Sequence, residues 1–270
     1  MTNKNTRNIS KVSSILAGLA LVSSQQAQAE KVDTELILLI DVSGNKGNSV
    51  FAEQQDAYVE AFRSSEVMDA IYNGSMKSVA ASVVLFAGKS QQYTAVEWMK
   101  IHDVDSANAF ANAMQSVEAP FTGKNAMGEA IGYASKQFGE ETGGEANGFE
   151  SLYQIIQVSS HSVDNDSGHR RRDRGNNVAE QRDAAIAAGV DRIDGVASDR
   201  CDHNLEEYFQ DYVIGGKDAE VSYYELGDKI SPLLSRKLVK EIESVNSVPE
   251  PSSAILVGLG SLGFLFRRNR

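Results

Sequence analysis

One stretch decides the fold: Glu35-Leu36-Ile37-Leu38-Leu39-Ile40-Asp41-Val42-Ser43-Gly44-Asn45. Its run of five apolar residues leads directly into an acid, a hydroxyl, a glycine and an amide. An apolar run of this length predicts a strand buried on both faces, in the middle of a parallel sheet. Polar residues just past the carboxyl end of such a strand lie where open α/β sheets bind ligands. Asp41 and Ser43 are therefore candidate site residues, and a polar loop that caps the next helix is the alternative.

The rest of the core alternates between strand and helix patterns. Strands are expected over 37–41, 79–86, 93–99, 153–158, 190–196 and 221–224, and helices over 51–62, 106–117, 125–138, 178–188, 205–213 and 227–244. This alternation predicts an α/β fold with a doubly wound, mostly parallel six-stranded sheet and helices on both faces. The turn Gly88-Lys89-Ser90 makes a hairpin of its neighbouring strands, which places one antiparallel strand at an edge. We expect Asp105 or Ser106 to cap the second helix and Gly215-Gly216 to form a turn.

The amino-terminal residues have the layout of a processing segment. Lys4, Arg7 and Lys11 precede an apolar stretch over 12–22, and Ala27-Gln28-Ala29 offers small residues for cleavage. This pattern predicts a secretory signal peptide over 1–29, because the apolar part is too short to remain as a membrane span. The exported core is then one domain over 30–248, a normal size for a single α/β domain.

The carboxyl-terminal residues have three parts. Pro249-Glu250-Pro251 is followed by an apolar run over 254–266 and then by Arg267-Arg268-Asn269-Arg270. Arginines after a short apolar tail make a stop signal that keeps the end cytoplasmic. The whole of 249–270 resembles the PEP-CTERM sorting signal of Gram-negative bacteria. The resemblance implies recognition by an exosortase-type enzyme, loss of the tail, and delivery to the cell surface, outer membrane or extracellular matrix; an ordinary membrane anchor is the alternative.

Charge and cysteine content narrow the class of protein. The formal net charge is −11, and the core alone carries −16, because the leader adds three positive charges and the tail adds two. So acidic a core excludes non-specific binding to nucleic acid or to anionic membrane, which leaves the tail as the one expected membrane contact. The single cysteine, Cys201, has no partner for an intramolecular disulfide, so it is either buried or used between molecules.

The order of elements, with Asp41-Val42-Ser43-Gly44 after the first strand, resembles a von Willebrand factor A-type domain over the whole core. Further stretches are similar to a bacterial family of exported A-type domains without an assigned biochemical role: Pro120-Phe121-Thr122-Gly123 and the segments 126–131, 182–185, 212–216 and 236–238. A-type domains commonly hold Mg²⁺ in a metal-ion-dependent adhesion site. Its pattern is Asp-x-Ser-x-Ser after the first strand, a threonine before a later helix and an aspartate after the fourth strand.

Placed on that pattern, this chain departs from it at three positions. Asp41 and Ser43 match, Asn45 and Asn125 stand at the second serine and the threonine, and His161 stands at the second acid. Both asparagines offer a carbonyl oxygen to Mg²⁺, whereas His161 removes a negative charge and suits Zn²⁺, Cu²⁺ or Ni²⁺ better. We therefore predict a degenerate site in which Ser43 and nearby backbone N–H groups hold Asp41.

Two alternatives keep a metal at this position. Asp164 and Asp166 follow closely in the same loop and could supply the missing acid. Zinc bound through Asp41 and His161 is the second alternative, although two ligands make a weak site.

A basic run, His169-Arg170-Arg171-Arg172-Asp173-Arg174, stands out in the acidic core. Arginine forks bind carboxylate, sulfate and phosphate well, so Arg170, Arg171, Arg172 and Arg174 are candidate contacts for an anionic polysaccharide or an acidic protein. A solvated loop is the alternative. The run follows the fourth strand and lies on the same rim as Asp41.

The patterns of the common enzyme classes are missing from the sequence. Gly123-Lys124-Asn125 lacks the first glycine and the final hydroxyl of a phosphate-binding loop, and no Gly-x-Ser-x-Gly nucleophile turn occurs. We therefore expect a non-enzymatic surface or matrix module that binds an extracellular protein or exopolysaccharide through the carboxyl-end rim of its sheet. A purely structural matrix component, self-associating through Cys201, is the alternative, and a hydrolase is a third.

Overall fold

The computed structural model describes residues 29–44, 49–168, 174–198, 204–225 and 228–246. Its centre is one sheet in the order β3-β2-β1-β4-β5-β6, with β7 also paired to β5. The strands are β1 (Glu30–Asp41), β2 (Val79–Phe86), β3 (Gln92–Ile101), β4 (Phe149–Ser160), β5 (Arg192–Ser198), β6 (Gly215–Gly216) and β7 (Val221–Tyr224). The predicted mostly parallel sheet is confirmed, and β3 pairs antiparallel at one edge as predicted.

One short strand was not expected. Gly215 and Gly216, predicted as a turn, form β6 and pair antiparallel with Ile193 and Arg192. Gly216 has a φ of +92°, and a Cβ there would lie 2.2 Å from the carbonyl oxygen of Asp191. Only glycine allows the chain to pass so close to β5. With β6 added, the described sheet has seven strands rather than the predicted six.

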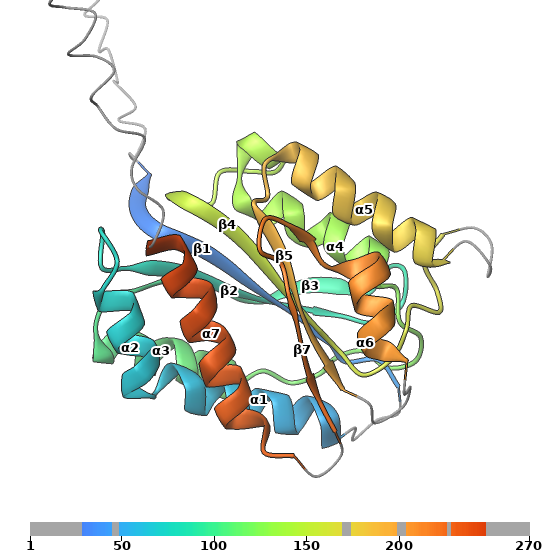
Figure 1. Cartoon of the computed structure of the whole chain (residues 1–270), viewed down its shortest axis with the longest axis horizontal. Helices are drawn as coiled ribbons and strands as arrows, with labels where there is room; N and C mark the ends of the chain where they lie inside the picture. Colours follow the sequence, from blue (N-terminus) through green and yellow to red (C-terminus); the bar gives the residue numbers. More distant parts are fainter. Residues whose placement is uncertain (1–28, 45–48, 169–173, 199–203, 226–227, 247–270) are drawn as a thin grey trace, which may run out of the picture.

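Helices cover both faces of the sheet, as predicted (Figure 1). Those on one face are α1 (Ser49–Phe62), α2 (Ser65–Tyr72), α3 (Val104–Gln115) and α7 (Ile230–Asn246); those on the other are α4 (Met127–Ser135), α5 (Arg174–Ala188) and α6 (Leu205–Tyr208). A π-helical turn, Phe209–Val213, continues α6. None of these described helices combines the length and the apolar character needed to cross a membrane.

The central strand β1 contributes to two separate cores. Leu36, Leu38 and Ile40 pack with α1, α2, α3 and α7, whereas Ile37 and Leu39 pack with α4 and α5. Alternate side chains of a strand point to opposite faces, and all five of these side chains are at most 1% exposed. The sequence prediction of a strand buried on both faces is therefore confirmed.

Several helix starts differ from the sequence prediction by a few residues, and those of α3 and α4 bear on the site and the caps. α3 is capped by Asp103 rather than by Asp105 or Ser106: Asp103 accepts a hydrogen bond from the Ser106 N–H, and the Ser106 hydroxyl closes the capping box. α4 starts at Met127 rather than at Asn125, because the backbone and side chain of Asn125 are bound to neighbouring loops.

Candidate functional site

Asp41 ends β1 and is completely buried. Its Oδ1 accepts a hydrogen bond of 2.8 Å from the backbone N–H of Ser43, two residues further on. A carboxylate buried away from water is costly unless hydrogen-bond donors surround it. The last residue of β4 and the loop before α4 supply the other donors.

The second oxygen of Asp41 is held by two side chains. The Asn125 amide nitrogen donates to Asp41 Oδ2 over 2.8 Å, and the Ser160 hydroxyl donates to the same oxygen over 2.5 Å. Asn125 Nδ2 also lies 3.0 Å from Ser160 Oγ and 3.2 Å from the Ser162 carbonyl oxygen. His161, 4% exposed, places Nδ1 3.4 Å from Asp41 Oδ2. Donors from three segments therefore surround one carboxylate.

Backbone pairing fixes these segments relative to one another. Gly44 and Gly123 exchange two hydrogen bonds of 2.8 Å as an isolated antiparallel bridge. Their φ angles of +97° and +106° favour glycine at both positions. The carbonyl oxygen of Asn125 accepts from the N–H groups of Asn165 and Asp166, over 2.9 and 2.8 Å. We call the group Asp41, Ser43, Gly44, Gly123, Asn125 and Ser160–Ser162 the carboxyl-end rim.

Two acids in the loop after β4 are engaged elsewhere. Asp164 accepts from the N–H groups of Gly128 (3.1 Å) and Ser167 (2.8 Å) and so caps the start of α4. Burial raises the pKa of Asp164. Asp166 accepts from Lys124 Nζ over 2.8 Å, and this hydrogen bond lowers the pKa of Asp166. Both carboxylates therefore already have partners away from Asp41.

The donor set around Asp41 does not fit a hard cation. Mg²⁺ requires oxygen ligands in near-octahedral geometry, whereas the atom of Asn125 that faces Asp41 is a nitrogen carrying two protons. Asp41 Oδ2 instead accepts hydrogen bonds from an amide and a hydroxyl. Among the described residues, no group of three or more His, Cys, Asp or Glu side chains is arranged to hold a metal ion.

The structure brings together four of the five residues predicted for the degenerate metal site: Asp41, Ser43, Asn125 and His161. The fifth, Asn45, lies outside the described residues. So do Arg170, Arg171 and Arg172, Cys201, residues 1–28 of the signal peptide predicted over 1–29, and the sorting tail with Pro249, Glu250, Pro251, Arg267 and Arg268. Arg174 is the first residue of α5. Sequence reasoning missed Ser160, which donates to Asp41; its position next to His161 was the available signal.

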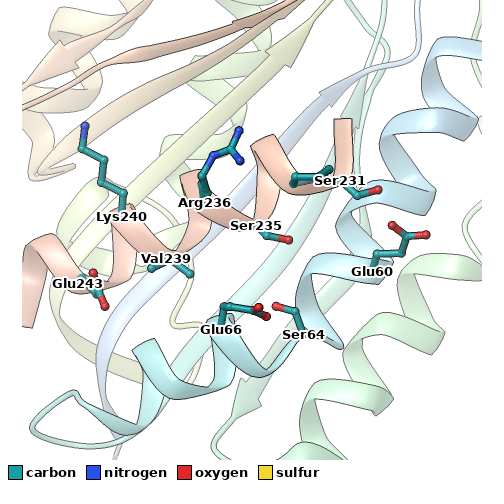
Figure 2. Close-up of a pocket in the computed structure, with 10 residues that line it drawn as sticks. Glu60, Ser64, Glu66, Ser231, Ser235, Arg236, Val239, Lys240 and Glu243 are labelled. Atoms are coloured by element: carbon teal, nitrogen blue, oxygen red, sulfur yellow. The ribbon is translucent and has the colours of Figure 1, made fainter. Parts of the chain in front are cut away.

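A hollow of about 590 Å³ lies away from this rim, between α7 and the corner of α1 and α2. Figure 2 shows Arg236, Lys240 and Glu243 of α7 on its border, opposite Glu60 and Glu66. Both signs of charge line it. It shares no lining residue with the carboxyl-end rim.

This sheet order, with helices on both faces and a carboxylate at the end of the central strand, defines a von Willebrand factor A-like domain. The chain belongs to the family described as "Protein of unknown function (DUF1194)", whose model matches residues 31–246. Residues 247–270 match the PEP-CTERM protein-sorting motif, which indicates an exported, cell-surface protein sorted by an exosortase. No curated protein matches the chain in sequence.

Several solved structures share the fold. The von Willebrand factor domain of the type V pilus tip protein Mfa5 from Porphyromonas gingivalis is 9% identical, with a TM-score of 0.53 over 83% of this chain and 99% of that one. The pilus adhesin SpaC from Lactobacillus rhamnosus GG is 12% identical, with a TM-score of 0.53 over 81% of this chain and 31% of that one.

Proximal thread matrix protein 1 from the mussel byssus is 19% identical. Its structure is described with a zinc-occupied MIDAS (metal-ion-dependent adhesion site) motif. Its TM-score is 0.50 over 80% of this chain and 49% of that one. The chain thus spans about a third of the pilus adhesin and about half of the mussel protein. At these identities the likeness shows the fold alone.

Proposed function

We propose that this protein is an exported binding module that contacts an extracellular protein or exopolysaccharide through its carboxyl-end rim, without a cation at Asp41. In this proposal an exosortase-type enzyme processes the tail over 249–270, a signal peptidase removes residues 1–29, and the core over 30–248 is the working domain. The module is not an enzyme. No nucleic acid is among its partners, because the acidic core repels phosphate.

The observation that carries this proposal is the hydrogen bonding of Asp41. An adhesion-site cation completes its shell with a carboxylate from the partner, so such binding depends on free metal. Here the Asn125 amide and the Ser160 hydroxyl donate hydrogen bonds to Asp41 Oδ2 instead. A rim built in this way holds its loops in fixed positions whether or not metal is available, because the Gly44–Gly123 bridge ties them together.

The contact surface in this proposal includes the loops over 44–49, 121–125 and 159–176. Lys124 is an exposed basic residue of this surface, with a side chain 66% exposed. Arg170, Arg171, Arg172 and Arg174 extend the same basic character in the sequence, which suits a partner that carries carboxylate or sulfate groups.

A binding experiment with and without metal tests the proposal. The purified protein is co-sedimented with extracellular polymer and envelope fractions of the producing bacterium, once with EDTA and once with Mg²⁺. We expect equal binding in both buffers, and a loss of tenfold or more in Lys124→Glu. Lys217→Glu is the matched control, because Lys217 is 86% exposed at the opposite end of the sheet, after β6.

Binding that appears only with Mg²⁺ would refute the cation-independent mode. Absence of binding in both buffers would refute the binding function itself and leave the structural alternative. A sizing column with and without reductant then detects self-association through Cys201.

A further inference from the structure

Two adjoining hollows lie at the end of the sheet opposite the carboxyl-end rim, where β1 and β4 begin at Glu30 and Phe149. The first hollow, of about 440 Å³, has Phe149 in its wall, and the second, of about 370 Å³, has Trp98. Ala146 and Asn147 line both. The two hollows therefore open next to each other and offer one extended concave surface.

Exposed carboxylates surround both hollows. Among the described lining residues, Lys136 is the one basic side chain, against four exposed acids: Glu97, Glu140, Glu145 and Glu150. Lys31 lies 3.9 Å from Glu150 and adds a second positive charge, whereas Glu30 and Lys100 pair over 2.9 Å and cancel each other. Acids therefore outnumber bases by two to one. We call the two hollows with these four glutamates the acidic end.

Aromatic rings line the acidic end as well. The ring centroid of Trp98 lies 5.7 Å from that of Phe138 and 6.4 Å from that of Phe149, and Trp98 and Phe149 are half-buried. A guanidinium group can stack on an aromatic ring and also pair with carboxylates. The four glutamates do not converge on one point, since the described residues include no group of three His, Cys, Asp or Glu arranged for a metal ion. The acidic end therefore suits cationic side chains, arginine above all.

Hydrogen bonds fix the walls of the acidic end. Asn147 Nδ2 donates to the carboxyl group of Glu35 and, over 2.8 Å, to the carbonyl oxygen of Phe138. Asn147 Oδ1 accepts from the Phe149 N–H over 2.9 Å. Trp98 Nε1 donates to the carbonyl oxygen of Gln137 over 3.0 Å. Because both walls are held in this way, the acidic end is preformed and little ordering is needed when a partner binds.

The contact surface proposed at the rim has the opposite charge. Its loops over 44–49, 121–125 and 159–176 contain six basic and three acidic residues, a formal charge of +3 within a core of −16. Lys124 is exposed among them. The buried charges of α7 are balanced inside the domain, where Lys237 and Glu241, each 2% exposed, pair over 3.5 Å. The two ends of the sheet therefore differ in the sign of the charge that they offer to a partner.

We propose that the partner of the contact surface is the acidic end of a second copy of this chain, so that copies join head to tail. The two surfaces lie at opposite ends of β1, whose 12 residues separate them by roughly 40 Å. A contact between two different patches leaves one of each unoccupied, so it repeats into an open chain of copies. This inference rests on the proposed binding through the rim and gives that binding a partner.

Ionic strength decides when this contact forms. The net negative charge of each copy opposes association, but at about 0.1 M salt charges more than about 10 Å apart are largely screened. The groups that face each other across the contact lie closer than this and have opposite signs. At about 1 M salt the screening length falls to about 3 Å, so the contact should be lost. Association through apolar surface would not weaken with salt in this way.

Sedimentation equilibrium of the purified protein tests the head-to-tail contact. Reductant is present throughout, so that Cys201 cannot link copies. We expect a mass that grows with protein concentration at about 0.1 M salt and a monomer at about 1 M. The rim variant Lys124→Glu/Arg174→Glu and the end variant Glu97→Lys/Glu145→Lys should each lower the association constant tenfold or more. Mixed together, they should form dimers and nothing longer, because each keeps the surface that the other has lost.

A matched control separates the acidic end from the net charge. Glu60→Lys/Glu66→Lys makes the same change in net charge as the end variant, but at the hollow shown in Figure 2. Both glutamates are exposed, so this variant should associate like the wild type. An equal loss of association in the control and in the end variant would overturn the proposal, as would a mixture of rim and end variants that stays monomeric.

Binding to the extracellular fractions distinguishes this inference from the proposed function. The end variant keeps its rim, so it should still co-sediment with those fractions. A wild type that co-sediments but stays monomeric at about 0.1 M salt would overturn the head-to-tail contact alone, and would leave the acidic end to a cationic partner outside this chain. A wild type that does not co-sediment would refute binding of those fractions, while its own association would still support the contact between copies.

Discussion

The amide of Asn125 determines what the buried carboxylate of Asp41 can do. Its nitrogen lies 2.8 Å from Asp41 Oδ2 and donates a proton there. A threonine at this position would offer a hydroxyl oxygen, which can face a cation as a ligand. His161 has the complementary effect, because it provides no carboxylate to balance a divalent charge. These two side chains together set the rim up for hydrogen bonding rather than for metal binding.

Restoring the two altered side chains should restore a metal site. We expect the double variant Asn125→Thr/His161→Asp to bind Mg²⁺, since it regains a second carboxylate and a ligating hydroxyl beside Asp41 and Ser43. Calorimetric titration should show heat of binding in the double variant and none in the wild type. Adding Asp41→Ala to the double variant should abolish the heat. A double variant without any Mg²⁺-dependent heat would show that Asn45 or the loop geometry also prevents binding.

Most residues of this rim could be predicted from the sequence, but the hydrogen bonds among them could not. Asp41 and Ser43 follow directly from an apolar strand that ends in polar residues. The alignment with the adhesion-site pattern singled out Asn125 and His161. Ser160 was not predicted, because which of several adjacent serines turns toward Asp41 depends on the twist and register of β4 against β1.

The start of α3 is stabilised by a reciprocal pair of hydrogen bonds. The Ser106 N–H donates to Asp103 Oδ1 over 2.7 Å, and the Asp103 N–H donates to Ser106 Oγ over 3.0 Å. The sequence has three possible caps within four residues, Asp103, Asp105 and Ser106. Only the direction in which the chain enters the helix decides among them, and that direction is set by the end of β3.

Removing one member of this capping box should destabilise the protein measurably. We expect Ser106→Ala to lower the free energy of unfolding by about 1 kcal/mol, because two N–H groups at the helix start lose their acceptor. Ser116→Ala, at the exposed end of the same helix, should change it by less than about 0.5 kcal/mol. Urea unfolding followed by circular dichroism measures both. Equal effects of the two substitutions would contradict a special role for the cap.

The two cores of the molecule share the strand β1, and this sharing should make them unfold together. Leu38 packs on the side of α1 and α7, whereas the single tryptophan, Trp98, packs against the other core, next to Phe138. The alternation of apolar side chains in β1 made both cores predictable from the sequence. The buried charges of α7 were not predictable, because Lys237 and Glu241 carry no pattern that distinguishes them from the exposed charges nearby.

Leu38→Ala should therefore destabilise the cores on both faces of the sheet. We expect a loss of about 3 kcal/mol from the cavity it creates. The fluorescence of Trp98 and the circular dichroism signal should shift to the same lower urea midpoint, although Trp98 lies on the other face. Leu152→Ala, which truncates a side chain that is 47% exposed, is the control and should leave both midpoints nearly unchanged. Separate midpoints for the two signals in Leu38→Ala would mean that the cores unfold independently.

The place of α7 at the end of the domain also decides how the molecule responds to mechanical force. A pull on the carboxyl terminus acts first on the last turn of α7, where Arg192 holds Ser244 over 2.9 Å and the carbonyl oxygen of Glu241. These contacts would break one after another as α7 is pulled off the sheet. β1 is flanked on both sides by parallel strands, so it bears force only after α7 has detached. The domain should thus extend in two steps, a yielding helix followed by a resistant sheet.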